Sequence, residues 1–169
     1  MNKLIHLGLL ALALTGAAQA ATYTNASQGF NLRYPDSWTK RENIQGAVVA
    51  VVAPASGGFS RNVNVVVIPG APAGTKLDDI LSANRANLAK QIKGLKVLLQ
   101  RSVSVGGVNG RELVYTGSVS TAGTRELRFK QRYTIQGSKL YVLTQTALAN
   151  DTGADAALTP VLDSFSFKK

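Results

Sequence analysis

The second half of the chain is divided by glycines into segments in which apolar and polar residues alternate. These segments cover residues 95–105, 111–119, 125–136 and 140–148. A period of two is typical of strands with one buried face, and glycine-rich breaks between such strands are typical of hairpin turns. The pattern therefore predicts an antiparallel meander of four strands.

A helix is expected immediately before this meander. Between Leu77 and Ile92, apolar residues recur at helical spacing. Thr75 and Asp78 stand where a capping box would begin the helix, and Gly94 stands where a glycine would end it. This segment is predicted to be the main helix of the domain.

Further strands and a second helix complete the expected domain. Residues 30–34 alternate between apolar and polar, and Pro35 ends the segment because proline has no amide proton. Residues 47–53 and 63–68 are apolar runs rich in β-branched residues, interrupted only by Asn64, of the kind found in buried strands. With a short helix at 155–165, the pattern predicts an α+β domain in which helices flank an antiparallel β-sheet.

The first twenty residues have the composition of a secretory signal peptide. Lys3 supplies a positive charge, residues 4–14 are apolar but too few to span a bilayer, and a small-x-small cleavage site ends at Ala20. We therefore expect residues 1–20 to be removed and residues 21–169 to form one exported domain, periplasmic or extracellular. No later apolar run approaches the roughly 20 residues of a transmembrane helix.

The residue types that carry most catalytic chemistry are missing from the expected mature domain. The chain has no cysteine, and its one histidine, His6, leaves with the signal peptide. Ser-His-Asp or Cys-His catalysis and zinc or copper sites built on these ligands are therefore excluded. A carboxylate-dependent hydrolase stays open, although no motif selects a pair among the nine acids. We expect no enzymatic activity, no metal and no cofactor.

Positive charge dominates the chain and is unevenly distributed. The formal net charge is +10, and residues 85–132 contain ten Lys or Arg against two acids. This asymmetry favours an anionic envelope component or an acidic protein as partner, with nonspecific binding of polyanions at low salt. The alternative is a structural envelope protein whose charge serves solubility alone.

The predicted strand at 125–136 carries the clearest chemical pattern. Arg128, Lys130 and Arg132 fall on one of its faces, and apolar residues fall on the other. Same-face residues of a strand are about 6.6 to 7 Å apart, so the three cations would form a ladder matching an extended polyanion or lipid headgroups. We expect these side chains to lie in solvent, either as a binding site or as like charges that prevent edge aggregation.

The sequence around the first predicted strand resembles the aromatic-x-aliphatic-x-Tyr-Pro-x-x-Trp opening of the PsbP-like superfamily. The residues that carry the resemblance are Phe30, Tyr34, Pro35 and Trp38. The closing segment at 162–165 is consistent with it, and the likeness extends over nearly the whole mature chain. It implies an α/β/α sandwich around an antiparallel sheet and a non-enzymatic role in binding or assembly, without naming a partner. We also expect Phe30, Tyr34 and Trp38 to be core anchors.

From the residues and the resemblance, we expect an exported, non-catalytic binding or accessory domain. Its partner would be an anionic envelope component or an acidic protein, held by Arg128, Lys130 and Arg132. A carboxylate-dependent hydrolase and a structural envelope protein with no dedicated ligand are the alternatives.

Overall fold

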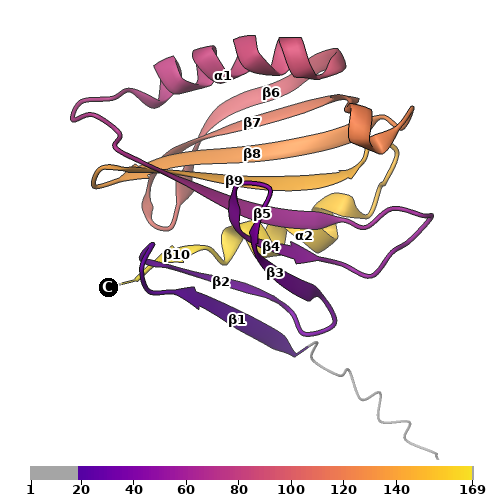
Figure 1. Cartoon of the computed structure of the whole chain (residues 1–169), viewed down its shortest axis with the longest axis horizontal. Helices are drawn as coiled ribbons and strands as arrows, with labels where there is room; N and C mark the ends of the chain where they lie inside the picture. Colours follow the sequence, from indigo (N-terminus) through magenta and orange to yellow (C-terminus); the bar gives the residue numbers. More distant parts are fainter. Residues whose placement is uncertain (1–18, 169) are drawn as a thin grey trace, which may run out of the picture.

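The computed structural model describes residues 19–168 and contains two antiparallel sheets and two α-helices (Figure 1). Residues 1–18 of the predicted signal peptide lie outside the described residues. The larger sheet comprises β3 (Thr39–Ile44), β4 (Ala47–Val52), β5 (Asn62–Pro69), β6 (Lys93–Val105), β7 (Val108–Ser118), β8 (Leu127–Gln136) and β9 (Lys139–Leu148). The smaller sheet comprises β1 (Ala20–Asn25), β2 (Phe30–Pro35) and β10 (Ser166–Phe167). The helices are α1 (Leu77–Gln91) and α2 (Ala154–Asp163), with a 3₁₀ turn η1 (Ser120–Ala122).

The four consecutive strands β6 to β9 form the predicted meander. The larger sheet has the strand order β3-β4-β5-β9-β8-β7-β6, so β6 and β3 are its two edges. The hairpin between β6 and β7 turns through Gly106 and Gly107, whose φ angles are +60° and +86°. A two-residue hairpin turn of this hand needs left-handed backbone at both positions, which glycine adopts without strain.

Two strands that the sequence pattern did not predict lie at sheet edges. β1 pairs with β2, and β3 pairs with β4. In β3 all residues except Ile44 are exposed, so the strand has no apolar run that would mark it. Its backbone is held by hydrogen bonds to β4, whose alternate residues are buried.

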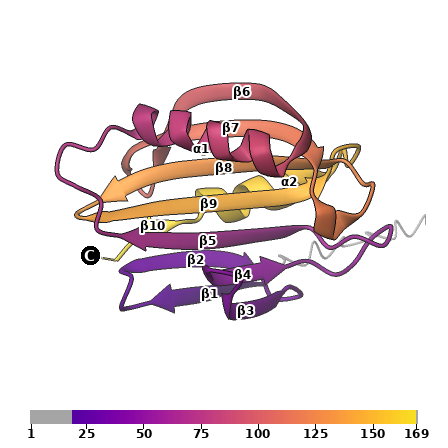
Figure 2. The same cartoon turned by 45° about the horizontal axis from the view of Figure 1, so that its top comes forward.

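The helices cover opposite faces of the larger sheet, as the predicted fold class requires. Figures 1 and 2 show α1 lying over β6, β7 and β8, while α2 lies on the other face. Helix α2 contacts β5 and β9 of the larger sheet and β2 of the smaller sheet. Both faces of the meander are therefore covered, at least in part, by other elements.

The core on the α2 side is built around the aromatic motif. Phe30 is completely buried, and its ring stacks on Phe165 with ring centroids 5.3 Å apart. Tyr34 and Trp38 pack against the same core but are only partly buried, and Pro35 is the last residue of β2. Phe30 is therefore the core anchor, while Tyr34 and Trp38 lie at the margin of the core.

The core on the α1 side is smaller. Leu81, Leu88 and Ile92 pack onto Leu113 of β7 and Tyr133 of β8. Close approach of α1's end to the sheet depends on Gly117, because a Cβ there would lie 2.3 Å from Ile92 Cγ2.

The predicted capping box of α1 is wrong. The helix begins after Lys76, which makes no side-chain capping bond. The Thr75 hydroxyl donates to the carbonyl of Pro72 instead, and Asp78 forms an ion pair with Arg111. Gly94 does not end the helix; it lies at the start of β6.

Replacing Phe30 by alanine is expected to lower the free energy of unfolding by about 3 to 5 kcal/mol, because a fully buried ring leaves a cavity between the two sheets. Urea titration followed by the fluorescence of Trp38, the only tryptophan, measures the loss. Trp38→Phe serves as the marginal-site control, followed by circular dichroism. A loss below about 1 kcal/mol for Phe30→Ala would contradict its assignment as the anchor.

Candidate functional site

The three cations predicted to form an exposed ladder lie beneath α2. They share one face of β8, as predicted, but Lys130 is only 8% exposed and Arg132 only 7%. The Arg128 side chain keeps 30% of its surface exposed. The expectation of solvent exposure was wrong for Lys130 and Arg132, because α2 covers this face with acidic side chains of its own.

Asp155 of α2 neutralises two of these cations. Its carboxylate accepts hydrogen bonds from Arg128 Nη1 at 2.7 Å and from Lys130 Nζ at 2.8 Å. Gln145 of β9 donates to the same carboxylate at 2.9 Å. Burial by itself would raise the pKa of Asp155, but the hydrogen bonds from Lys130, Arg128 and Gln145 outweigh it and hold the pKa well below its ordinary value.

Glu112 of β7 is the centre of a second group of ion pairs. Its side chain has no exposed surface, and it accepts hydrogen bonds from Arg132 Nε at 2.9 Å and Arg101 Nε at 2.8 Å. Arg132 also donates to Asp163 of α2 at 2.6 Å. Burial opposes the charge of Arg132, but its bonds to Asp163 and Glu112 raise its pKa, so the guanidinium stays charged. The group links β6, β7 and β8 to α2.

The acidic residues of the chain are largely used in such pairs. All nine lie within residues 19–168, and six of them form ion pairs there: Glu42, Asp78, Glu112, Asp151, Asp155 and Asp163. Each of five shallow pockets on the described surface is lined by at most one carboxylate. Glycoside hydrolysis needs two carboxylates about 5 to 10 Å apart across one cleft. These pockets therefore provide no such pair for the hydrolase alternative.

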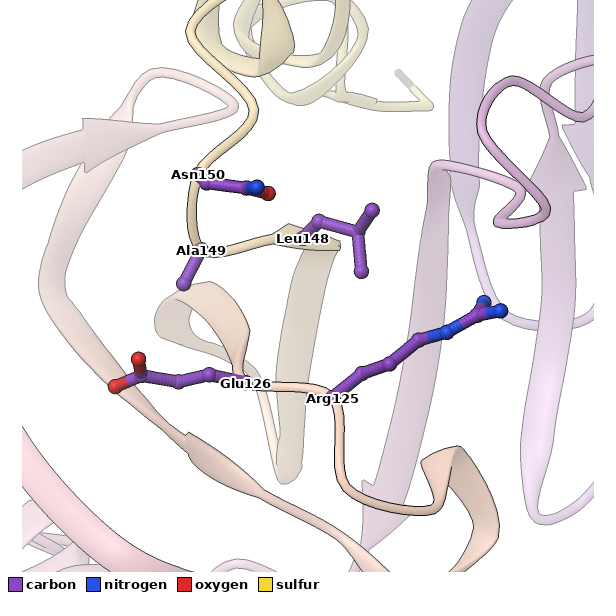
Figure 3. Close-up of a pocket in the computed structure, with 5 residues that line it drawn as sticks. All are labelled: Arg125, Glu126, Leu148, Ala149 and Asn150. Atoms are coloured by element: carbon purple, nitrogen blue, oxygen red, sulfur yellow. The ribbon is translucent and has the colours of Figure 1, made fainter.

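One of these pockets, of about 480 Å³, lies where η1 leads into β8 and β9 ends (Figure 3). Glu126 is its one carboxylate, and Figure 3 shows that the side chains of Glu126 and Arg125 point in opposite directions. Arg125 Nη1 donates to the carbonyl of Gly58 at 2.6 Å. The arrangement contains no acid and base facing one another.

The structure also bears on metals and membrane spans. Between residues 19 and 168, no three His, Cys, Asp or Glu side chains are grouped so that they could hold a metal ion. In the same part of the chain, no helix is both long enough and apolar enough to cross a membrane.

A different set of cations is exposed and unpaired. Arg85 and Lys90 of α1 and Lys93 and Lys96 of β6 are exposed, and none forms an ion pair with any acid of the described chain. The remaining cations without an ion pair among residues 19–168 are Arg33, Arg41, Lys76, Arg125, Lys139 and Lys168.

Three consecutive aliphatic residues are exposed on β6 beside these four cations. Val97, Leu98 and Leu99 have 38%, 54% and 42% of their surface exposed. We call the four cations and these three residues the α1/β6 surface. Sequence analysis placed the four cations in the charge-rich segment but did not single them out. The available signal was that Lys96 directly precedes an apolar run and Lys93 lies three residues before Lys96.

Comparison with known proteins identifies the fold. No family model matches the chain, and no match was found among curated proteins. Cyanobacterial PsbP (CyanoP) from Synechocystis sp. PCC 6803 has a TM-score of 0.63 and 16% identity, covering 90% of this chain and 95% of its own. The two sheets and their flanking helices therefore have the same fold as cyanobacterial PsbP.

Two further solved structures share this fold. LpqN of Mycobacterium tuberculosis has a TM-score of 0.61 and 16% identity, covering 89% of this chain and 91% of its own. The Ran-binding protein Mog1p of Saccharomyces cerevisiae has a TM-score of 0.59 and 7% identity, covering 89% of this chain and 96% of its own. LpqN is involved in cell envelope biogenesis, so the two proteins serve different functions on one fold.

Replacing Arg132 by methionine is expected to lower the free energy of unfolding by about 3 to 5 kcal/mol, because Glu112 then stays buried with one of its two cations gone. Arg128→Met, the matched control at a more exposed position, should cost less than about 1 kcal/mol. Chemical denaturation of both variants provides the comparison. Equal and small losses would show that the Glu112 ion pairs contribute little to stability.

The stability of the protein is expected to fall as the pH drops below about 4, where unfolded aspartates begin to bind protons. The folded-state pKa of Asp155 is lowered, so near this pH the unfolded chain binds more protons than the folded chain. The stability that Asp155 contributes is therefore present above its pKa in the unfolded chain, and it is lost as the pH falls toward its pKa in the folded protein. In denaturation measured from about pH 6 to pH 2, the difference between wild type and Asp155→Asn should shrink. A constant difference would contradict this role of Asp155.

Proposed function

We propose that this chain is an exported, non-catalytic binding or accessory domain that engages an anionic partner through the α1/β6 surface. The observation that carries the proposal is the separation of two sets of cations. Arg128, Lys130 and Arg132 are neutralised by Asp155, Glu112 and Asp163. The cations of the α1/β6 surface are exposed and have no such partners among residues 19–168.

The role of the first set is then structural. A charged side chain whose hydrogen bonds are already made inside the protein has few donors left for a ligand. Breaking those bonds to bind a ligand would leave an unpaired charge inside the protein. We assign Lys130 and Arg132 to holding α2 on the sheet, with Arg128 supporting them at the rim.

The second set has the properties of an encounter surface. Unpaired Lys and Arg side chains in solvent create a positive potential that attracts anionic partners and raises association rates at low salt. Such attraction is screened within about 10 Å at 0.1 M salt, so binding through this surface would weaken as salt is added.

Export and a non-catalytic role rest on separate support. The expected signal peptide at residues 1–20 supports export. The fold is compatible with a binding role, since Mog1p binds Ran and LpqN takes part in cell envelope biogenesis on the same fold.

A pull-down from a detergent extract of bacterial cell envelopes tests the proposal. The immobilised domain should retain an anionic component at about 0.05 M salt and release most of it at about 0.5 M. The triple variant Lys90→Glu, Lys93→Glu, Lys96→Glu should lose it. Retained protein is identified by mass spectrometry, and retained lipid is measured by its phosphorus.

The matched control has the same change in charge elsewhere. Arg33, Arg41 and Lys168 are exposed and unpaired within the described chain, and their triple change to glutamate should leave retention nearly unaltered. Equal loss of retention in both variants would show that binding depends only on net charge, and would contradict a dedicated surface. Retention of nothing by the wild type at low salt would favour the structural alternative.

A further inference from the structure

We propose that the partner of the α1/β6 surface is an anionic lipid surface, on which Val97, Leu98 and Leu99 enter the headgroup region while the neighbouring cations contact lipid phosphates. This inference rests on the function proposed above and names the chemical class of the partner. It is carried by the backbone irregularity of β6, by its exposed aliphatic side chains and by the charges around them.

The irregularity consists of two extra residues in β6 relative to β7. Lys93 pairs with Ser118 and Lys96 with Thr116, so three steps on β6 oppose two on β7. The second irregularity follows at once, because Val97 pairs with Tyr115 and Leu99 with Val114, which leaves Leu98 as the extra residue. Such bulges bend a strand and redirect its side chains.

The bulge at Leu98 turns adjacent apolar side chains toward both sides of the sheet edge. Tyr115 belongs to the core beneath α1, and its neighbour Val114 points to the opposite face of the sheet. Val97 and Leu99, which lie across from them, therefore also point to opposite faces. With Leu98 between them, three aliphatic residues surround one stretch of the free edge.

A shallow groove continues this apolar area toward α1. It has a volume of about 550 Å³ and is lined by Ser82, Arg85, Ala86, Ala89, Leu95 and Val97. Arg85 lines the groove, and its guanidinium donates a long hydrogen bond of 3.5 Å to Gln100 Oε1 of β6. The small alanine side chains of α1 leave the groove open to solvent.

The charges around this area are of one sign. Lys96 stands immediately before the aliphatic residues in β6, Lys93 lies three residues before Lys96, and Lys90 lies in the last turn of α1. Arg101 follows in the same strand and, although paired with Glu112, keeps 55% of its side-chain surface exposed. Aliphatic residues ringed by Lys and Arg match the interface of an anionic bilayer, where long basic side chains reach phosphates while apolar groups enter between headgroups.

A partner strand fits this edge less well than a lipid surface does. Strand addition requires a regular row of unpaired N–H and C=O groups. The two bulges interrupt that row between Lys93 and Leu99, where the cations and aliphatic residues are concentrated. A fluid lipid surface needs no matching backbone, and the headgroup region keeps water available to the open edge.

Cosedimentation with vesicles tests the inference, using the chain from Ala20 onward because residues 4–14 are apolar and would bind lipid themselves. This piece contains every described element, and its cooperative unfolding is checked first. The probes are vesicles of equal parts phosphatidylglycerol and phosphatidylcholine, and vesicles of phosphatidylcholine alone. We expect binding to the first and little to the second, with release at about 0.5 M salt.

Two pairs of variants separate the charge from the aliphatic contribution. Lys93→Glu with Lys96→Glu should weaken binding by at least about tenfold, whereas Arg33→Glu with Arg41→Glu, of equal charge change, should weaken it far less. Leu98→Ser should weaken binding about threefold or more. Ile68→Ser is the matched control for Leu98→Ser, since Ile68 is 48% exposed but lies near the end of β5, away from the α1/β6 surface.

Each outcome decides the inference. Loss in the β6 variants with binding kept in the controls supports it. No binding of the wild type to anionic vesicles overturns it, as does an equal loss in the control variants or full binding by Leu98→Ser. If vesicles are not bound but the pull-down retains an acidic protein through Lys90, Lys93 and Lys96, the inference fails and the proposed function stands.

Discussion

A carboxylate with no exposed surface, that of Glu112, sets the arrangement of one whole side of the sheet. A buried charge is tolerated only when it is paired and hydrogen-bonded. Arg132 and Arg101 meet this requirement from the strands on either side, and Arg132 extends it to Asp163 at the end of α2. The end of α2 is thereby tied to β8 by an ion pair, and the aromatic core between the two sheets forms beneath the same helix. The charges of the interior thus decide which cations are left for the surface.

Much of the fold follows from periodicity. The alternation after Gly94 correctly predicted β6 to β9, and the apolar runs before α1 correctly predicted β4 and β5. These predictions succeed because a strand with a buried face carries its own pattern. β1 and β3 could not be found in this way: β3 is almost wholly exposed and exists because β4 offers it hydrogen-bonding groups. The capping-box prediction was wrong because Asp78 forms an ion pair with Arg111 of β7, a residue far from it in the sequence.

The candidate site was only partly predictable. The charge-rich segment was recognised, but Arg128, Lys130 and Arg132 have the same alternating pattern whether their face meets water or a helix. Their acidic partners on α2 lie 25 to 31 residues further along the chain, beyond the reach of any local pattern. Only the pairing in three dimensions shows which cations are neutralised inside. Once those pairs are known, the exposed cations of α1 and β6 can be recognised among those that pair with no acid of residues 19–168.

The bulge at Leu98 has a consequence for how this segment tolerates change. Upstream of it Val97 faces the groove beside α1, and downstream of it Arg101 faces Glu112. Both orientations are possible only because one extra residue separates them. If the segment were shortened by one residue, either Val97 would leave the groove or Arg101 would leave Glu112. The length of β6 between α1 and Arg101 is therefore more tightly constrained than its composition.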